Sequence, residues 1–143
     1  MMRLTLFAIT IAIAILLQTV SATTANRKLR MCCRKSPEAD RECRKRFCNF
    51  DLLHQGSVFQ FLAMCAARGD TVSKMWDCVS SRIDHTACCT ANGVIQHCMP
   101  YCNTIEKVPT DFVKYGICIG QFNQIRDCFR GYLERNPNLK GDQ

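Results

Sequence analysis

The chain has 143 residues, twelve cysteines and a formal net charge of +7 at pH 7. This length limits the fold to one compact domain or two small fused units, and it excludes a large apolar core. So many cysteines in a short chain predict a disulfide framework, provided that the protein reaches an oxidising compartment. Disulfides would then supply much of the stability that a small core cannot.

The N-terminus is typical of a secretory signal peptide. Residues 1–22 contain one early charge, Arg3, followed by an uncharged apolar run over 4–17 and small residues near the end. That run is too short to span a bilayer, which takes about 20 apolar residues. We expect cleavage after Ala22, with Ala25 as the second choice. The protein is therefore predicted to be secreted and extracellular, without a membrane anchor.

The cysteines form two successive copies of one pattern, and each copy opens with two adjacent cysteines. The first copy is Cys32, Cys33, Cys43, Cys48, Cys65 and Cys78, and the second is Cys88, Cys89, Cys98, Cys102, Cys118 and Cys128. The order of the cysteines is the same in both copies, although the spacings between them differ by a few residues. This similarity indicates an internal repeat. Adjacent cysteines on a helix point in different directions, so each should join a different neighbour. The sequence does not choose among the possible pairings.

Helix signals recur through the first copy. Ser36, followed by proline, predicts a helix over 37–48. Apolar residues at offsets of three, four and seven predict a second helix over 57–67. A glycine and an aspartate then end this helix and cap a third one, over 71–80. The inward face of the third helix is expected to carry Val72, Met75, Trp76 and Val79.

The second copy repeats this plan. Asp84 or Thr86 can cap a short helix through Cys89, and one or two further turns carry the next two cysteines. After Thr110, apolar residues recur every three or four positions and predict a last helical region, which two glycines can divide. The polar tail, 136–143, is expected to fray.

The alternation of apolar and polar residues that is typical of β-strands is weak throughout the sequence. We therefore predict an all-α, small disulfide-rich helical domain over 32–128, built from two pseudo-repeated six-cysteine units, 32–78 and 88–128. A basic N-terminal arm, 23–31, is expected before this domain. A helix end and the polar tail, 129–143, are expected after it.

A signature in the middle of the chain resembles a known family. The run from Cys78 to Cys89 contains Asp84-His85-Thr86 directly before the second adjacent pair, and it is followed by Gly93-Val94, Cys98 and Cys102. This pattern resembles the DB module, a twelve-cysteine module of nematode secreted and cell-surface proteins, some of which also carry immunoglobulin-type domains. The resemblance covers residues 32–128. It implies six disulfides and an extracellular setting, but no enzymatic activity and no catalytic residues.

Asp84 and His85 invite an acid–base interpretation, because a carboxylate beside a histidine is half of many catalytic constellations. Neighbours at a helix entry do not face each other, however, whereas Asp or Thr at an N-cap binds free backbone amides. Zinc is a weaker alternative for the cysteines, because paired C-x2-C spacings are lacking. We predict a non-enzyme without catalytic residues, metal or cofactor.

Basic residues are concentrated near the start of the predicted domain. The segment 27–46 has nine of them against three acids: Arg27, Lys28, Arg30, Arg34, Lys35, Arg41, Arg44, Lys45 and Arg46. Such a cluster can attract sulfated glycans, anionic lipid heads or an acidic receptor patch. The alternative is a solvated face that keeps the protein soluble. A nucleic-acid partner is not expected for a secreted protein.

Two further features have both a functional and a structural interpretation. Arg68-Gly69-Asp70 is a tripeptide that integrin-type receptors bind, although a glycine C-cap and an aspartate N-cap between two helices explain the same residues. Trp76 and the phenylalanines fit a core, although aromatic residues around a cavity could hold a lipid.

These features favour a secreted, disulfide-stabilised interaction module. Its predicted partner is an extracellular or cell-surface protein, and the family resemblance suggests an immunoglobulin-type receptor. Two alternatives stay open: a carrier of a small apolar ligand or lipid, and a basic matrix protein that binds sulfated glycans.

Overall fold

The computed structural model describes the backbone of residues 2–143 and the side chains of residues 7, 9–15 and 24–143. The expected cleavage position after Ala22 lies outside the residues whose side chains are described. Within the described chain the secondary structure is helical without a strand, so the all-α prediction is confirmed. Asp84 and Asn103 form one isolated bridge.

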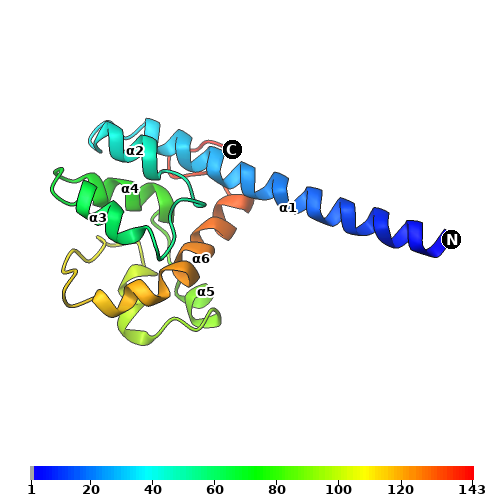
Figure 1. Cartoon of the computed structure of the whole chain (residues 1–143). Coiled ribbons are helices and arrows are strands. Elements are labelled where there is room, and N and C mark those ends of the chain that lie inside the picture. The colour runs from blue at the N-terminus through cyan, green and yellow to red at the C-terminus, as the bar shows by residue number, and fades with distance from the viewer. Residues whose placement is uncertain (1) are drawn as a thin grey trace.

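Six α-helices and two 3₁₀ helices follow one another along the described chain (Figure 1). They are α1 (Met2–Arg34), α2 (Arg41–Phe47), α3 (Val58–Cys65), α4 (Thr71–Ser80), α5 (Thr86–Ala91), the 3₁₀ helices η1 (Gln96–Tyr101) and η2 (Gly116–Gln121), and α6 (Phe122–Arg135). Helices α3 and α4 lie where the apolar spacing predicts them. Among the described residues, no helix is both long and apolar enough to cross a bilayer.

All twelve cysteines are paired, and every disulfide closes within its own unit. The pairs are Cys32–Cys78, Cys33–Cys48, Cys43–Cys65, Cys88–Cys128, Cys89–Cys102 and Cys98–Cys118. The order of pairing is the same in both units: first with sixth, second with fourth, third with fifth. Adjacent cysteines join different partners, as the helix geometry predicts. None of the sulfurs is therefore a free thiolate for zinc.

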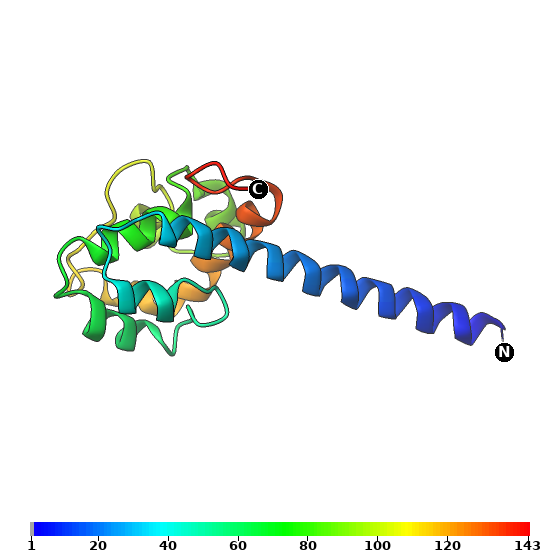
Figure 2. The ribbon, with the colours of Figure 1, turned by 90° about the horizontal axis from the view of Figure 1, so that it is seen from above.

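Helix α1 has two different parts. Its N-terminal part projects away from the globular body (Figures 1 and 2) and exposes apolar side chains such as Phe7, Ile11 and Ile15. Its C-terminal part lies in the body, where Ala25 and Leu29 are fully buried. Signal-peptide cleavage during export would remove this exposed apolar part of α1. Such cleavage stays a prediction from the sequence.

The structure places no separate arm over 23–31, because these residues continue α1 into the core. Lys28 is only 5% exposed, and its Nζ donates to Leu133 O and Asn136 O, each at 2.9 Å. The C-terminal tail also packs against α1: Asn138 is buried and donates to Lys28 O at 2.8 Å. The expectation that the tail frays is wrong, because α1 supplies partners for its polar groups.

Helix α2 begins later than the sequence predicts. The Ser36 hydroxyl does not cap it, because that hydroxyl donates to Cys32 O at the end of α1. The N-cap is Asp40, whose Oδ1 accepts the Cys43 N–H at 3.0 Å. This hydrogen bond lowers the pKa of Asp40, and the Arg68 guanidinium lowers it further.

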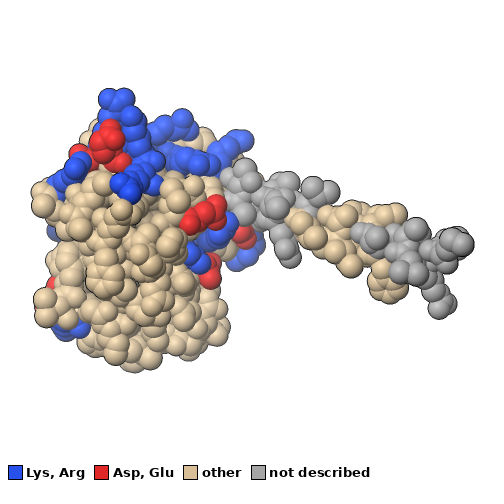
Figure 3. Space-filling view, viewed as in Figure 1, with Lys and Arg blue, Asp and Glu red and all other residues tan. Residues whose placement is uncertain are grey.

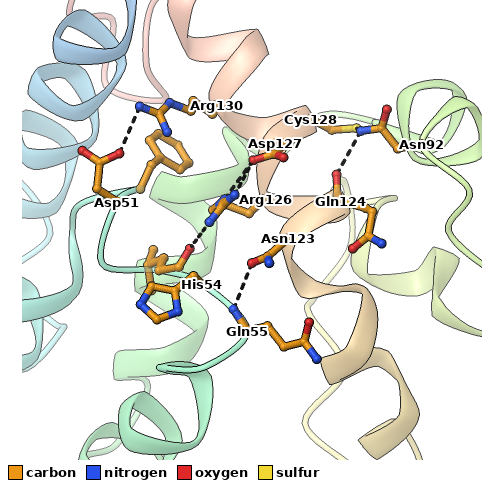
Figure 4. A network of polar contacts seen from close by, with 12 residues as sticks. Asp51, His54, Gln55, Asn92, Asn123, Gln124, Arg126, Asp127, Cys128 and Arg130 are labelled. Carbon is orange, nitrogen blue, oxygen red and sulfur yellow. Dashed lines mark hydrogen bonds and ion pairs between the residues drawn. The ribbon is translucent and has the colours of Figure 1, made fainter. Parts of the chain in front are cut away.

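Helix α6 joins the two cysteine units (Figure 4). Towards the first unit, Arg126 donates to Leu53 O at 3.0 Å, and Arg130 pairs with Asp51 at 3.1 Å. Towards the second unit, Asn92 donates to Gln124 O at 3.1 Å. On its apolar face, α6 packs against α1 and α4, so one continuous core extends through both units.

Candidate functional site

Two surface features are candidate ligand sites. The first, called here the basic cleft, has a volume of about 510 Å³ and lies between α1 and α2. It is lined by Arg27, Arg30, Cys33, Arg34, Arg41, Arg44 and Lys45. Figure 3 shows blue cationic side chains gathered over α1 and α2, whereas the lower part of that face is largely uncharged.

Contacts between the two helices hold Arg44 in the basic cleft. Its Nη1 donates to Cys33 O at 3.0 Å and to Arg34 O at 3.2 Å, which are carbonyls at the end of α1. Its Nε is buried and has no partner among the described residues. Lys45 has an acidic neighbour, Glu42, at 3.8 Å.

Three of the nine predicted basic residues do not line the cleft. Lys28 is buried against α6, Lys35 pairs with Asp142 in the tail, and the Arg46 guanidinium lies 5.5 Å from the centre of the Phe47 ring. The sequence identifies the cluster but does not separate these three from the other six. That separation depends on which face of α1 meets α6.

The second feature, called here the Trp76 pocket, is an apolar hollow of about 60 Å³ between the two units. The first unit contributes Val58, Phe61, Leu62, Val72 and Trp76, and the second contributes Tyr101, Val108, Pro109, Phe112, Tyr115, Cys118, Ile119, Phe122 and Ile125. Its wall contains no Asp, Glu, Lys, Arg or His. The pocket therefore favours an uncharged, apolar group.

Three aromatic residues of this pocket carry a polar atom: Trp76, Tyr101 and Tyr115. The Trp76 Nε1 is buried and has no hydrogen-bond partner among the described residues. The Tyr101 hydroxyl donates to Pro109 O at 3.3 Å, and burial raises the pKa of Tyr101 to about 12. The tyrosine thus stays neutral at physiological pH, while the indole N–H is a donor without an acceptor.

Exposed apolar side chains lie next to pocket residues in the chain. Val113, beside Phe112, is 95% exposed, and Ile117, beside Cys118, is 65% exposed. Phe59, beside Val58 in α3, is also 65% exposed. Exposed apolar residues are common at protein-binding surfaces, and these three are adjacent in the chain to residues that line the hollow.

Asp84 and His85 do not form an acid–base pair. The Asp84 carboxylate accepts the Thr86 N–H at 2.9 Å, which lowers the pKa of Asp84. His85 is buried, and its Nε2 donates to Ser80 O at 2.7 Å beside the left-handed residues Ser81 and Arg82. Burial lowers the pKa of His85, an effect partly offset by that hydrogen bond and by Asp84. This segment is a capped turn.

Arg68, Gly69 and Asp70 form an exposed turn between α3 and α4. Gly69 has φ +58°, so a glycine is favoured there. The Asp70 side chain makes no capping hydrogen bond, contrary to the cap interpretation. Arg68 pairs with the N-cap residue Asp40 at 2.7 Å. A receptor that binds this tripeptide would first have to break that ion pair.

Comparison with known families identifies the cysteine framework. The family description "DB module" matches residues 32–129. The chain belongs to the DB module family. Comparison with curated proteins and with solved structures finds no match.

Membership in this family identifies the chain as containing a small, disulfide-stabilised domain of extracellular type. The Trp76 pocket lies wholly inside the matched DB module region, whereas the basic cleft also uses Arg27 and Arg30, which precede it. The pocket joins segments that lie far apart in the sequence, 58–76 and 101–125. No local signal in the sequence could therefore have located it.

Proposed function

We propose that this DB module is a secreted interaction module, and that the Trp76 pocket receives one apolar side chain of an extracellular or cell-surface protein. The observation that carries this proposal is the apolar hollow between the two units, whose lining carries no charged side chain. Interface energy is typically concentrated in a few anchor residues that fill such pockets. An immunoglobulin-type domain is the first class of partner to test.

The volume of the pocket favours a side chain over a carried ligand. Sites for drug-sized ligands are clefts of about 300–1,000 Å³, and an engineered cavity of about 150 Å³ holds benzene. The Trp76 pocket offers about 60 Å³. A lipid carrier would need a much larger interior, whereas an anchoring side chain needs only a shallow, well-shaped site.

The indole N–H of Trp76 is buried, so a partner in the pocket meets the ring of Trp76 and not its donor. Trp76 lines the pocket, and its ring meets Tyr101 edge-on with a centroid separation of 5.6 Å. The partner is thus expected to place an apolar anchor against these aromatic rings.

The disulfides support the same role by holding the two sides of the pocket. Cys43–Cys65 anchors α3, and Cys98–Cys118 anchors η2. A surface that is already rigid loses less conformational entropy on binding, and this raises affinity without new contacts.

The test begins with a binding screen of the protein, secreted from the full chain, against extracellular domains. For a saturable partner, Phe112→Ala should weaken binding at least about tenfold, because truncating an anchor residue at an interface costs about 2 kcal/mol or more and about 1.4 kcal/mol corresponds to a factor of ten. Surface plasmon resonance measures the affinity. Because apolar burial is not screened, the affinity should change little between about 0.15 and 0.5 M NaCl.

Ile105→Ala is the matched control, since Ile105 is 57% exposed but does not line the pocket. It should change the affinity less than about twofold, as is usual for residues outside an interface core. Equal losses in both variants, or affinity that collapses with added salt, would contradict binding at the Trp76 pocket. A natively purified protein with a bound lipid would favour the carrier alternative.

A further inference from the structure

The basic cleft is a second candidate site, and it shares no lining residue with the Trp76 pocket. Its wall brings together five arginines and one lysine around Cys33, without a carboxylate among the lining residues. Close approach of like charges is unfavourable unless counter-charges lie nearby. Six cations around one hollow therefore indicate a site that is completed by an anionic ligand.

The two helices present these cations in different ways. Arg27, Arg30 and Arg34 follow one another at offsets of three and four, which puts them along one face of α1 over a length of about 10 Å. Arg41, Arg44 and Lys45 come from α2 on the other side of the cleft. The result is a channel with a row of charges on each side, suited to a linear polyanion.

The chemistry of the cations favours oxyanion groups. The planar guanidinium of arginine donates two parallel hydrogen bonds to a sulfate, phosphate or carboxylate, which an ammonium group cannot do. Arg44 is already oriented by two backbone carbonyls and keeps an unpartnered, buried Nε. The side chains of Arg27, Arg30, Arg34 and Arg41 are exposed, so a ligand can reach them.

We propose that the basic cleft binds a sulfated glycan chain. A volume of about 510 Å³ is in the usual range for ligand sites, about 300–1,000 Å³, and so accommodates saccharide units. A bilayer or a flat acidic protein surface would contact the rims of a cleft and leave its floor unfilled. Acidic groups near the cleft include Glu42, 3.8 Å from Lys45, and Asp142, which pairs with Lys35 and is influenced by the charge of Arg34.

The test is calorimetric titration of the secreted protein with a heparin hexasaccharide at about 0.15 M NaCl. The R30Q/R41Q variant should bind at least about tenfold more weakly, because hydrogen bonds to charged groups contribute about 1.5–3 kcal/mol each. R27Q/R34Q, as a second pair, should behave in the same way. The slope of log K against log salt concentration should become less steep by about one to two.

K107Q/K114Q is the matched control, because it removes the same charge from two exposed lysines that do not line the cleft. It should weaken binding less than about twofold, since distant charges are screened. Chemically desulfated heparin should not bind measurably. The F112A variant should keep its heparin affinity, which separates this proposal from the one for the Trp76 pocket.

Three outcomes would overturn the glycan assignment. Equal weakening in R30Q/R41Q and K107Q/K114Q would show that net charge alone acts. Undiminished binding of desulfated heparin would show that sulfate is not recognised. Tighter binding to phosphatidylserine vesicles or to polyglutamate than to heparin would assign the cleft to a membrane or an acidic protein.

Discussion

The double variant C32S/C78S is expected to lose about 3–5 kcal/mol of unfolding free energy, the upper part of the range for a native disulfide in a small secreted domain. Both cysteines are fully buried, and their bond ties the end of α1 to α4 across the first unit. It also closes the longest loop in the chain, with a sequence separation of 46. Urea denaturation followed by circular dichroism measures the loss.

The matched control is C89S/C102S, which removes a buried disulfide with a sequence separation of 13. In the chain-entropy description, the shorter loop contributes about 1 kcal/mol less. The control should therefore be the more stable of the two variants. A smaller loss for C32S/C78S than for C89S/C102S would contradict a stability that depends on linking α1 to α4.

Replacing Lys28 by methionine is expected to cost about 2–4 kcal/mol, because one buried and one partly buried carbonyl lose a charged donor. The Lys28 Nζ binds Leu133 O and Asn136 O at the C-terminal end of α6, where the helix dipole also favours a cation. Methionine keeps most of the apolar stem, so packing changes little. The variant should unfold at a lower urea concentration than the parent.

Lys107→Met is the control for this variant, because Lys107 is exposed. Surface substitutions of this kind usually change stability within about 0.5 kcal/mol. If K28M were as stable as K107M, Lys28 would not hold α6 against α1. Its charge would then be available at the surface, as the sequence suggests.

The element types could be predicted from local signals, but the pairing of elements could not. Apolar spacing locates α3 and α4 because their inward residues repeat at three and four positions. The disulfide connectivity depends on which helices meet, and that information is not local. The same holds for α6, whose contacts with both units are seen only in three dimensions.

The segment around Lys28 shows why charge can mislead. Ala25, Leu29 and Cys32 recur at offsets of four and three, which is the pattern of a buried helix face. The dense arginines and lysines hide this pattern and suggest a solvated arm. A lysine reaches into the core here because its partners, the last carbonyls of α6, are far away in the sequence.

The candidate sites differ in how far the sequence defines them. Six of the nine predicted basic residues line one cleft. The cluster of basic residues in the sequence therefore gives the approximate position of this candidate site. The Trp76 pocket could not be assembled from the sequence, because it lies between the two units. Trp76 itself was predictable as an inward residue, but its unpaired N–H was not.

Disulfide mapping of the secreted protein tests the central claim most directly, because both proposed sites depend on helices held by these bonds. Proteolysis without reduction, followed by mass spectrometry, identifies each linked pair. The structure predicts Cys32–Cys78, Cys33–Cys48 and Cys43–Cys65, with the same order repeated in Cys88–Cys128, Cys89–Cys102 and Cys98–Cys118. A free thiol, or one bond that joins the two units, would contradict it.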